Sequence, residues 1–469
     1  MSATIAFALD AMPLTRDLHL PVDYSARFIA EGVLAPLFAS GSAVNSAVEA
    51  SPREGGARWQ VRLDEGLRWS DGAPLRAVDA VRGIAHALKR GSNAATTFLD
   101  HSGKAAPVVA IDERTVEYRF RRPITFAPEL MSIPDFAPRR RTEGKGLSGG
   151  VALGPFAVER WQDREIVLRR NPHWEQVDPC PDELRFTCIA EPEEAVRSYL
   201  SGAIDMTATT GFGVKQAAEF AEHPHGVRRP IAVHGSLDFG RRAQGFLHAP
   251  QARRALAGLI DRAALSSATQ ALTRPWLPST GVWESVSPAD RDALRRAAKD
   301  GLDIAYSAFA PNAEAVTELA SQLGASLGVA VTTTELTFAQ YVRASADRDF
   351  CLLYALTSPV FDHPAGSLSF WRSTGRAARQ SAFADERFDE LLDLAEVCED
   401  PTEAAQRWRA AEERWWWTVP KIPLVQVCAW FLCSPGLAGA RISVDGLLRF
   451  ERLLDGSTGS GRLHPCAGA

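Results

Sequence analysis

The sequence has few lysines, no long hydrophobic run and no large excess of either charge. Only six of its 52 basic residues are lysines, and 57 acidic residues leave a formal net charge of −5. This near balance and a pI of about 6.1 argue against nucleic acid or an anionic membrane as a partner. No apolar stretch approaches the roughly 18 residues that a membrane-spanning helix needs.

The motifs of several familiar catalytic and metal sites are also missing. The sequence has no His-Glu-x-x-His, no phosphate-binding loop and no Cys-x-x-Cys pair. Its seven cysteines are widely spread, and only Cys428 and Cys433 are near enough in sequence to make a bridge an obvious alternative to reduced thiols. We therefore expect no catalytic residue set, no metal and no cofactor.

Residues 58–90 carry the most informative pattern in the chain. Apolar and polar residues alternate from Trp59 to Leu63, which predicts a half-buried strand. Asp64-Glu65-Gly66 predicts a turn, so that residues 67–69 would return as the second strand of a hairpin. Beyond Pro74 the spacing becomes helical, with an expected apolar face of Val78, Val81, Ala85 and Leu88.

Other stretches predict ordinary structural roles. Residues 302–306, 313–327 and 329–332 read as strand, helix and strand, which favours a parallel unit. Asp261 and Arg262 are interpreted as helix-end residues rather than catalytic ones. The Trp415-Trp416-Trp417 run is interpreted as core packing at a helical spacing, with ligand stacking as the alternative.

The order strand, turn, Asp-Gly-x-Pro and amphipathic helix resembles a segment of the bacterial extracellular solute-binding proteins of family 5. These are the peptide- and nickel-binding proteins of ABC importers. The residues in step include Asp71, Gly72, Pro74, Leu75, Ala77 and Asp79. Further segments resemble the family in the same order: 153–156, 171–174, 201–205, 249–262, 386–395 and 419–424. The resemblance covers nearly the whole chain, from about residue 5 to about residue 450.

The resemblance implies an α/β fold of the periplasmic-binding-protein type (class II, Venus-flytrap), with two lobes and a small extra lobe inserted in the first. The expected parts are lobe I in three pieces, 1–39, 150–236 and 425–455, the small lobe at 40–149, lobe II at 237–424, and a disordered tail at 456–469.

The resemblance also places a ligand cleft beside residues 354–372. Peptide-binding members commonly carry Trp-x-x-Asp at a strand edge, and the Asp holds the α-amino group of the ligand. Here Tyr354 stands at the Trp position and Thr357 at the Asp position. A hydroxyl cannot neutralise an ammonium group. Either Asp362 replaces the missing carboxylate, or the ligand has no free amine there, and we favour the second reading.

Six other residues complete the predicted site. Asp10 follows the first strand (residues 4–9) in a loop that faces the cleft in the family, although a turn carboxylate is the alternative. His363 is a candidate ligand contact for which an ordinary loop histidine is the alternative. Trp371 and Arg372 are candidates for an aromatic wall and an anion clamp, and Ala355 and Phe361 lie in the same stretch.

The predicted function is reversible capture of a peptide or peptide-like small metabolite in a cleft between the lobes by hinge closure, in a monomer that has an ABC permease as one partner. The alternative is a leaderless cytoplasmic protein on the same scaffold, acting as an enzyme or a ligand sensor in small-molecule metabolism. The chain as written starts without a leader pattern, so we expect a cytoplasmic protein, or an extracytoplasmic one if a leader has been removed.

Overall fold

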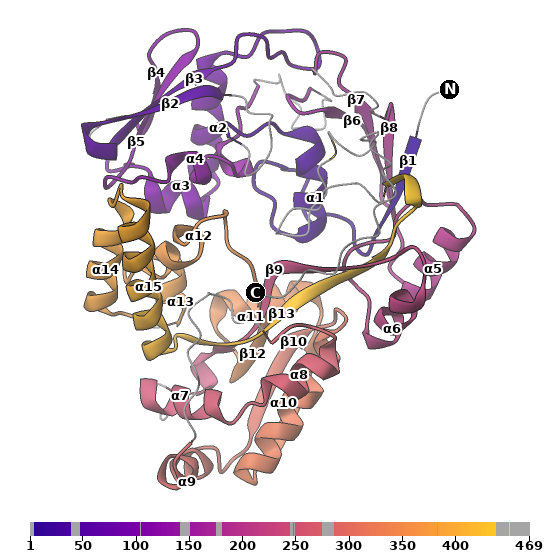
Figure 1. The fold of residues 1–469 in the computed structure, drawn as a ribbon, viewed down its shortest axis with the longest axis vertical. Coiled ribbons are helices and arrows are strands. Elements are labelled where there is room, and N and C mark those ends of the chain that lie inside the picture. The colour runs from indigo at the N-terminus through magenta and orange to yellow at the C-terminus, as the bar shows by residue number, and fades with distance from the viewer. Residues whose placement is uncertain are drawn as a thin grey trace.

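The computed structural model describes residues 4–38, 47–103, 105–140, 151–174, 181–243, 247, 249–273, 286–381, 383–437 and 450. These residues form three β-sheets with helices packed around them (Figure 1). The predicted tail at 456–469 lies outside the described residues. None of the described helices combines the length and the apolar character needed to cross a bilayer.

Lobe I is built on a four-stranded sheet with the order β1-β8-β7-β6. Its strands are β1 (Thr4–Leu9), β6 (Phe156–Trp161), β7 (Glu165–Arg170) and β8 (Glu183–Cys188), and only β1 and β8 run parallel. Helices α1 (Tyr24–Val33), α5 (Pro192–Leu200) and α6 (Val214–Glu222) belong to the same part.

Lobe II is built on a five-stranded sheet with the order β11-β10-β12-β9-β13. Strands β10 (Leu302–Ser307) and β11 (Val331–Leu336) are parallel and joined by α10 (Asn312–Leu327), which confirms the predicted strand–helix–strand unit. The other strands are β9 (Gly226–Phe239), β12 (Leu352–Thr357) and β13 (Lys421–Leu432). Helices α7 (Pro250–Gly258), α8 (Arg262–Thr269), α9 (Pro288–Ala297) and α11 (Phe338–Asp347) complete the lobe.

The small lobe is an antiparallel sheet, β2-β3-β5-β4, with three helices. Its elements are β2 (Ala47–Arg53), β3 (Arg58–Leu63), β4 (Val108–Ala110), β5 (Thr115–Arg119), α2 (Ala77–Lys89), α3 (Asn93–Phe98) and α4 (Ala127–Leu130).

Four helices after β12 pack on the small lobe. They are α12 (Ala365–Leu368), α13 (Arg376–Ser381), α14 (Glu386–Glu396) and α15 (Pro401–Thr418). One continuous hydrophobic core holds small-lobe residues such as Phe98 and Phe126 together with Phe361, Phe370 and Trp415. Figure 1 shows these helices beneath the small lobe, on the left of the view. The lobe boundaries given above stay a prediction, and this shared core joins parts that they separate.

Two long strands connect lobe II with lobe I. Strand β9 pairs with β12 through residues 234–239, and with β13 through residues 226–238. The pairing of β9 with β13 has irregularities at Pro423, Gln426 and Cys428. Proline has no amide hydrogen for the ladder, and a bulge bends a strand locally. The ribbon is therefore irregular near its middle.

The structure corrects the predicted hairpin. Strand β3 pairs with β2 on one side and β5 on the other, and not with residues 67–69. Leu67 and Trp69 instead bond to Leu75 and Ala73 across the Asp-Gly turn. Alternation identified the strand correctly, but the turn residues were assigned to the wrong pair of segments.

The predicted apolar face of α2 is wrong in part: Val81 and Leu88 lie half-buried against the core, but Ala85 is exposed, and the fully buried face is shifted by one residue. The buried residues of α2 are Ala77, Asp79, Ala80, Gly83, Ile84 and Ala87, while Val78 is exposed. Small side chains on this face allow close approach, so that the Arg139 amide donates to the Asp79 carbonyl at 2.8 Å. A Cβ atom added at Gly83 would lie 2.2 Å from the Ala137 carbonyl oxygen.

Several local predictions are confirmed. Asp261 caps α8 by accepting from the amides of Ala263 and Ala264, which is the helix-end role expected of it. The predicted core role is confirmed for Trp415, which is fully buried, and for Trp416, which is nearly so, but it is wrong for Trp417, which is exposed. Cys428 and Cys433 are free thiols rather than a bridge.

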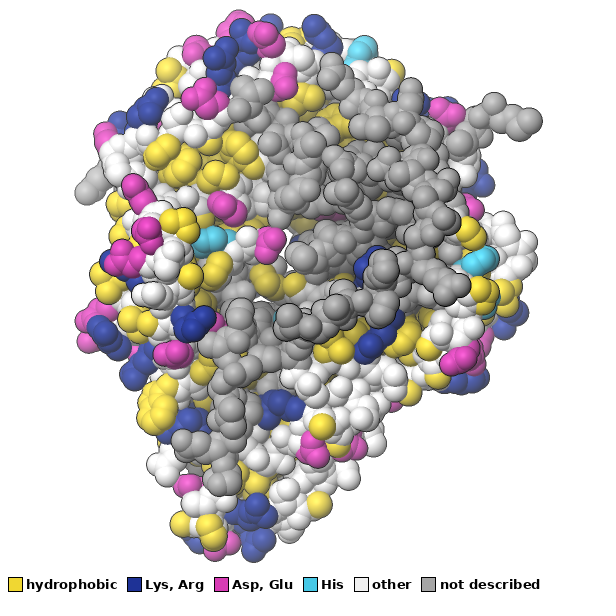
Figure 2. Space-filling view, viewed as in Figure 1, with side chains coloured by type: hydrophobic (Ala, Val, Ile, Leu, Met, Phe, Trp, Pro, Cys, Tyr) yellow, Lys and Arg dark blue, Asp and Glu magenta, His cyan; other side chains and the backbone are white. Residues whose placement is uncertain are grey.

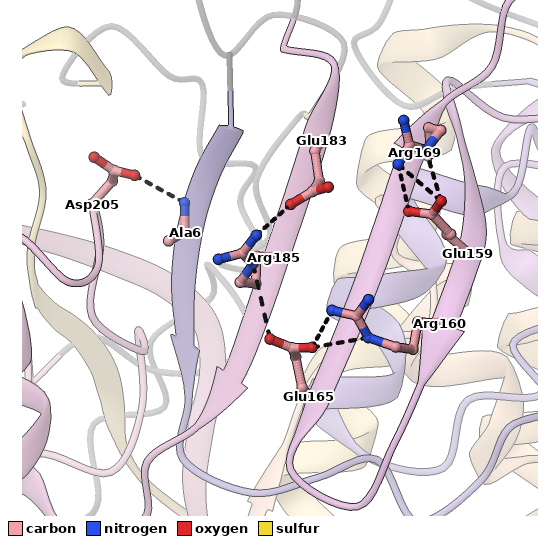
Figure 3. A network of polar contacts seen from close by, with 8 residues as sticks. All are labelled: Ala6, Glu159, Arg160, Glu165, Arg169, Glu183, Arg185 and Asp205. Atoms are coloured by element: carbon pink, nitrogen blue, oxygen red, sulfur yellow. Dashed lines mark hydrogen bonds and ion pairs between the residues drawn. The ribbon is translucent and has the colours of Figure 1, made fainter. Parts of the chain in front are cut away.

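Ion pairs line the strands of the lobe I sheet (Figure 3). Arg169 makes a two-pronged contact with Glu159, with both distances 3.0 Å, and Arg160 contacts Glu165. At the sheet edge, the Asp205 carboxylate accepts from the Ala6 amide at 2.9 Å. The pairs join neighbouring strands, and the Asp205 contact holds the chain after α5 against β1.

We predict that Gly83→Ala lowers the free energy of unfolding by about 2 kcal/mol, because the added methyl group meets backbone that cannot move aside. Alanine normally stabilises a helix by about 0.5–1 kcal/mol relative to glycine. The matched control is Gly324→Ala in α10, where the nearest atom is 3.5 Å away and a small gain is expected. Chemical denaturation of both variants checks this, and equal gains would refute the close packing of α2.

Candidate functional site

Lobe I approaches lobe II where α1 meets the loop after β12. The Arg27 guanidinium donates to the Ser358 hydroxyl at 3.4 Å. Figure 2 shows the face viewed in Figure 1, hollowed near its centre between the upper and lower parts. Acidic and basic side chains are interspersed over its described surface, so no field of one sign marks it. The charged groups that bear on function are buried inside the protein.

Asp10 stands just beyond the carboxyl end of β1, beside the parallel strand β8. Its carboxylate accepts from the Thr210 hydroxyl at 2.8 Å. Gly211 has φ +84°, and a side chain there would press on Asp10. Burial raises the pKa of Asp10, and the hydrogen bonds to it counteract the rise. Ligands of open α/β sheets gather at such strand ends, so the position suits a cleft residue.

Thr357 ends β12 and belongs to a polar cluster on one face of the lobe II sheet. The Lys421 ammonium group donates to the Thr357 hydroxyl at 2.9 Å and to the Ser236 hydroxyl at 3.3 Å, and it lies 3.1 Å from an Asp238 carboxylate oxygen. Lys421 is only 6% exposed. Three acceptors for three ammonium hydrogens satisfy the general requirement that a buried charge be paired.

A cavity of about 200 Å³ opens in front of this cluster. Its walls come from distant parts of the chain: Asn93 of the small lobe, Arg348 after α11, Thr357, Trp371 and Lys421. The Trp371 ring centre lies 5.7 Å from the Lys421 nitrogen. Polar groups converging on a partly apolar cavity are typical of a small-molecule site.

Tyr354 and Ala355 lie on opposite faces of β12, because side chains alternate along a strand. Tyr354 is 2% exposed and packs in the lobe II core with α10, and burial raises the pKa of its phenol. Its ring lies against Gly235, where an added Cβ would meet the hydroxyl at 2.7 Å. Ala355 is on the cavity side, and its carbonyl accepts from Ser236 at 3.3 Å.

The next three candidates separate from one another. Phe361 is buried in the core shared with the small lobe, and Asp362 is exposed. The His363 ring stacks on Phe126 at 4.7 Å and meets Trp408 edge-on at 5.3 Å. Burial lowers the pKa of His363 to about 4, so the ring is neutral at pH 7. This environment is that of a packing aromatic residue.

Trp371 and Arg372 are neighbours that point to different cavities. Trp371 lines the cavity at Thr357, whereas Arg372 lines a second one of about 330 Å³ with Arg121, Arg122 and Arg376. The Arg372 guanidinium donates to Asp393 at 2.7 Å and to Glu396 at 2.9 Å. Glu396 also accepts from Ser369 at 2.7 Å. Arg372 was predicted to bind an anion of the ligand, but in this structure its guanidinium binds the carboxylates of Asp393 and Glu396 on α14.

The structure therefore brings Thr357 and Trp371 to one cavity, puts Ala355 on the same face of β12 as Thr357, and places Asp10 on lobe I. The sequence reasoning missed Lys421, Asp238 and Arg348. A signal for Lys421 was present, since it is one of six lysines and interrupts the apolar run Val-Pro-Lys-Ile-Pro-Leu. Among the described residues, no group of three or more His, Cys, Asp or Glu side chains is placed to hold a metal ion.

Comparison with known proteins finds relatives both in sequence and in structure. The family described as bacterial extracellular solute-binding proteins, family 5 (middle), matches residues 43–379. The periplasmic murein peptide-binding protein MppA of Escherichia coli K12 is 24% identical over 446 residues, which cover 84% of this chain and 82% of that protein.

Solved structures share the fold at lower identity. OppA of Haemophilus influenzae in complex with the peptide RPPGFSPFR has a TM-score of 0.80 at 16% identity, covering 96% of this chain and 97% of the other. The unliganded open form of the murein tripeptide-binding protein MppA has a TM-score of 0.69 at 18% identity, covering 96% of both chains. The fold is thus the two-lobed periplasmic-binding-protein type.

We predict that Arg372→Met lowers the free energy of unfolding by about 3–5 kcal/mol near neutral pH, because it leaves the buried Glu396 carboxylate without its cation. Burial raises the pKa of Glu396, and Arg372 counteracts that rise. A carboxyl group with a raised folded-state pKa stabilises the protein at low pH, and this contribution is lost as the pH rises through that pKa. The loss should therefore be larger near pH 8 than near pH 5.

The control is Arg387→Met on α14, whose pair with Glu390 is exposed on both sides. Denaturation at both pH values should show little change for this variant. A loss of similar size in both variants, or one independent of pH, would contradict the buried pair.

Proposed function

We propose, for a chain that belongs to the bacterial extracellular solute-binding proteins of family 5, that it captures a peptide or peptide-like small metabolite between its lobes by hinge closure. The observation that carries this proposal is the cavity at Thr357, whose walls come from lobe II and the small lobe. A site divided between parts of the chain exists only when those parts are together. Ligand contacts then favour the closed arrangement.

The shape of the molecule supports a closed arrangement. It is more similar to the OppA complex than to the unliganded open form of MppA, judged by their TM-scores. Contacts between the parts agree with this. Arg27 reaches Ser358, and the Thr125 amide donates to the Glu396 carbonyl at 3.0 Å. Opening would break contacts of this kind, and a solute bound between the parts would add contacts that favour the closed arrangement.

The relatives support the ligand class and the partner. MppA and OppA are named for peptides, and both are named as periplasmic proteins. We therefore place capture outside the cytoplasmic membrane, by a monomer that delivers its ligand to an ABC permease. The residues proposed to contact the ligand are Asp10 on lobe I, Thr357 and Trp371 in the cavity wall, and Ala355 on the same face of β12 as Thr357.

The experiment is capture from a cell extract. Purified protein is incubated with extract, washed and denatured, and released species are identified by mass spectrometry alongside a thermal-shift assay. We predict a species recovered with its mass unchanged and a rise in Tm, since a ligand at 100 times its Kd adds about 2.7 kcal/mol of stability. A species converted to a new mass would favour an enzyme on this scaffold instead.

Two neighbouring substitutions test the position of the site. Thr357→Trp fills the cavity and should abolish both the captured species and the thermal shift. Leu356→Trp is the matched control, because Leu356 is 44% exposed and its side chain lies on the side of β12 opposite the cavity. Equal capture by both variants would show that the solute binds elsewhere.

A further inference from the structure

The cavity at Thr357 contains a protein ammonium group where a ligand ammonium group would be expected. Lys421 begins β13 directly opposite Asp238 of β9. Its side chain extends along the sheet to Thr357, which ends β12. Asp238 is thus neutralised by a cation of the chain itself and is not available as the carboxylate for a ligand amine.

The hydrogen-bonding state of Thr357 points the same way. Its oxygen accepts from Lys421, which leaves the hydroxyl hydrogen free to turn elsewhere. Within the described part of the chain, no bond donated by this hydroxyl is formed. Since Thr357 lines the cavity, the group it offers to a ligand is a donor polarised by an adjacent ammonium. A donor of this kind binds an oxygen acceptor.

The charge balance of the cavity is positive. Its charged lining residues are Asp238, Arg348 and Lys421. Arg348 donates to the Phe239 carbonyl at 3.2 Å, and its Nε is buried without a hydrogen-bond partner among the described residues. Two cations against one carboxylate leave one uncompensated positive charge, and in a cavity with a tryptophan wall this charge is weakly screened.

We propose that this cavity receives a carboxylate of the ligand, held by the Thr357 hydroxyl in the field of Lys421 and Arg348, and that it rejects a free ammonium group. This inference rests on the proposed function and names the ligand class: a peptide-like acid whose amino end is acylated or absent. Lys421 is a specificity-determining residue, because it reverses the charge that the cavity prefers.

The probes are three tripeptides that differ only at the amino end: free Ala-Ala-Ala, its N-acetyl form and its N-succinyl form, which carries a carboxylate there. Calorimetric titration should give the highest affinity for the succinyl peptide, at least tenfold above the free peptide, with the acetyl peptide between them. Equal affinities for the three peptides would overturn the proposal. So would failure of the succinyl peptide to bind while a species is still captured from extract.

Variants assign the preference to the cavity. Lys421→Met keeps the apolar stem and should reduce the difference between the succinyl and free peptides to less than threefold. Combining it with Thr357→Asp should invert the order, so that the free peptide binds best. Lys89→Met, at the exposed end of α2, is the control and should keep the order of the unaltered protein.

The outcomes separate the two proposals. An unchanged order in Lys421→Met contradicts the carboxylate site but leaves solute capture standing. If neither the peptides nor any extract species binds the unaltered protein, both solute capture and the carboxylate site are refuted. Circular dichroism of each variant reports whether it has folded.

Discussion

The pairing of β9 with β13 is the interaction on which the arrangement of the lobes depends. Residues 234–239 of β9 lie inside the lobe II sheet, while residues 226–230 pair only with the far half of β13. The end of β13 returns to lobe I, where Cys433 pairs with Met206, and Met206 with Phe7 of β1. Figure 1 shows β13 running from the lower part of the molecule to the upper right. A two-stranded ribbon with bulges is much easier to bend than a packed sheet, so the irregular segment around Pro423 and Gln426 is a natural place for hinge motion.

A second constraint limits which parts can separate. The small lobe contacts the segment between β12 and α13 through aromatic rings: Phe98 against Phe370 at 5.6 Å, and Phe126 against Phe361 at 5.9 Å. Each such pair contributes about 0.5–1.5 kcal/mol beyond its buried area. Separating the small lobe from α12–α15 would lose several of these contacts at once. In the closed arrangement the aromatic contacts lie on one side of the cleft and the polar cavity at Thr357 lies beside them. The aromatic contacts and a ligand in the cavity both favour closure.

The sequence predicted the elements better than their partners. Periodicity and turn residues located β1, β3, β10, β11 and α10 to within a few residues, because local alternation records which side of each element is buried. Pairing depends on distant segments, so Leu67–Trp69 was given to β3 although it closes its own turn with Ala73–Leu75. The phase of α2 was predicted wrongly because its buried face consists mostly of alanine and glycine, which hydropathy ranks below the exposed Val78.

Only part of the site was predicted, because the site also depends on contacts between distant segments. Family resemblance located Thr357, and the structure places it at a cavity, but spacing could not show that Tyr354 faces the opposite side of the sheet or that Arg372 serves Glu396. Lys421 lies 64 residues away from Thr357 in sequence, and only the return of β13 brings the two together. A contact that forms only because a strand returns from a distant part of the chain cannot be predicted from local sequence patterns.

Closure over a solute is the central claim, and small-angle X-ray scattering tests it most directly. Scattering curves are compared for the protein stripped of ligand by partial unfolding and refolding, and for the same protein loaded with the species captured from extract. We predict a smaller radius of gyration and a narrower distance distribution on loading, with the loaded curve matching the one calculated from this structure. Identical curves before and after loading, with binding verified by mass, would show that the lobes do not close on the ligand.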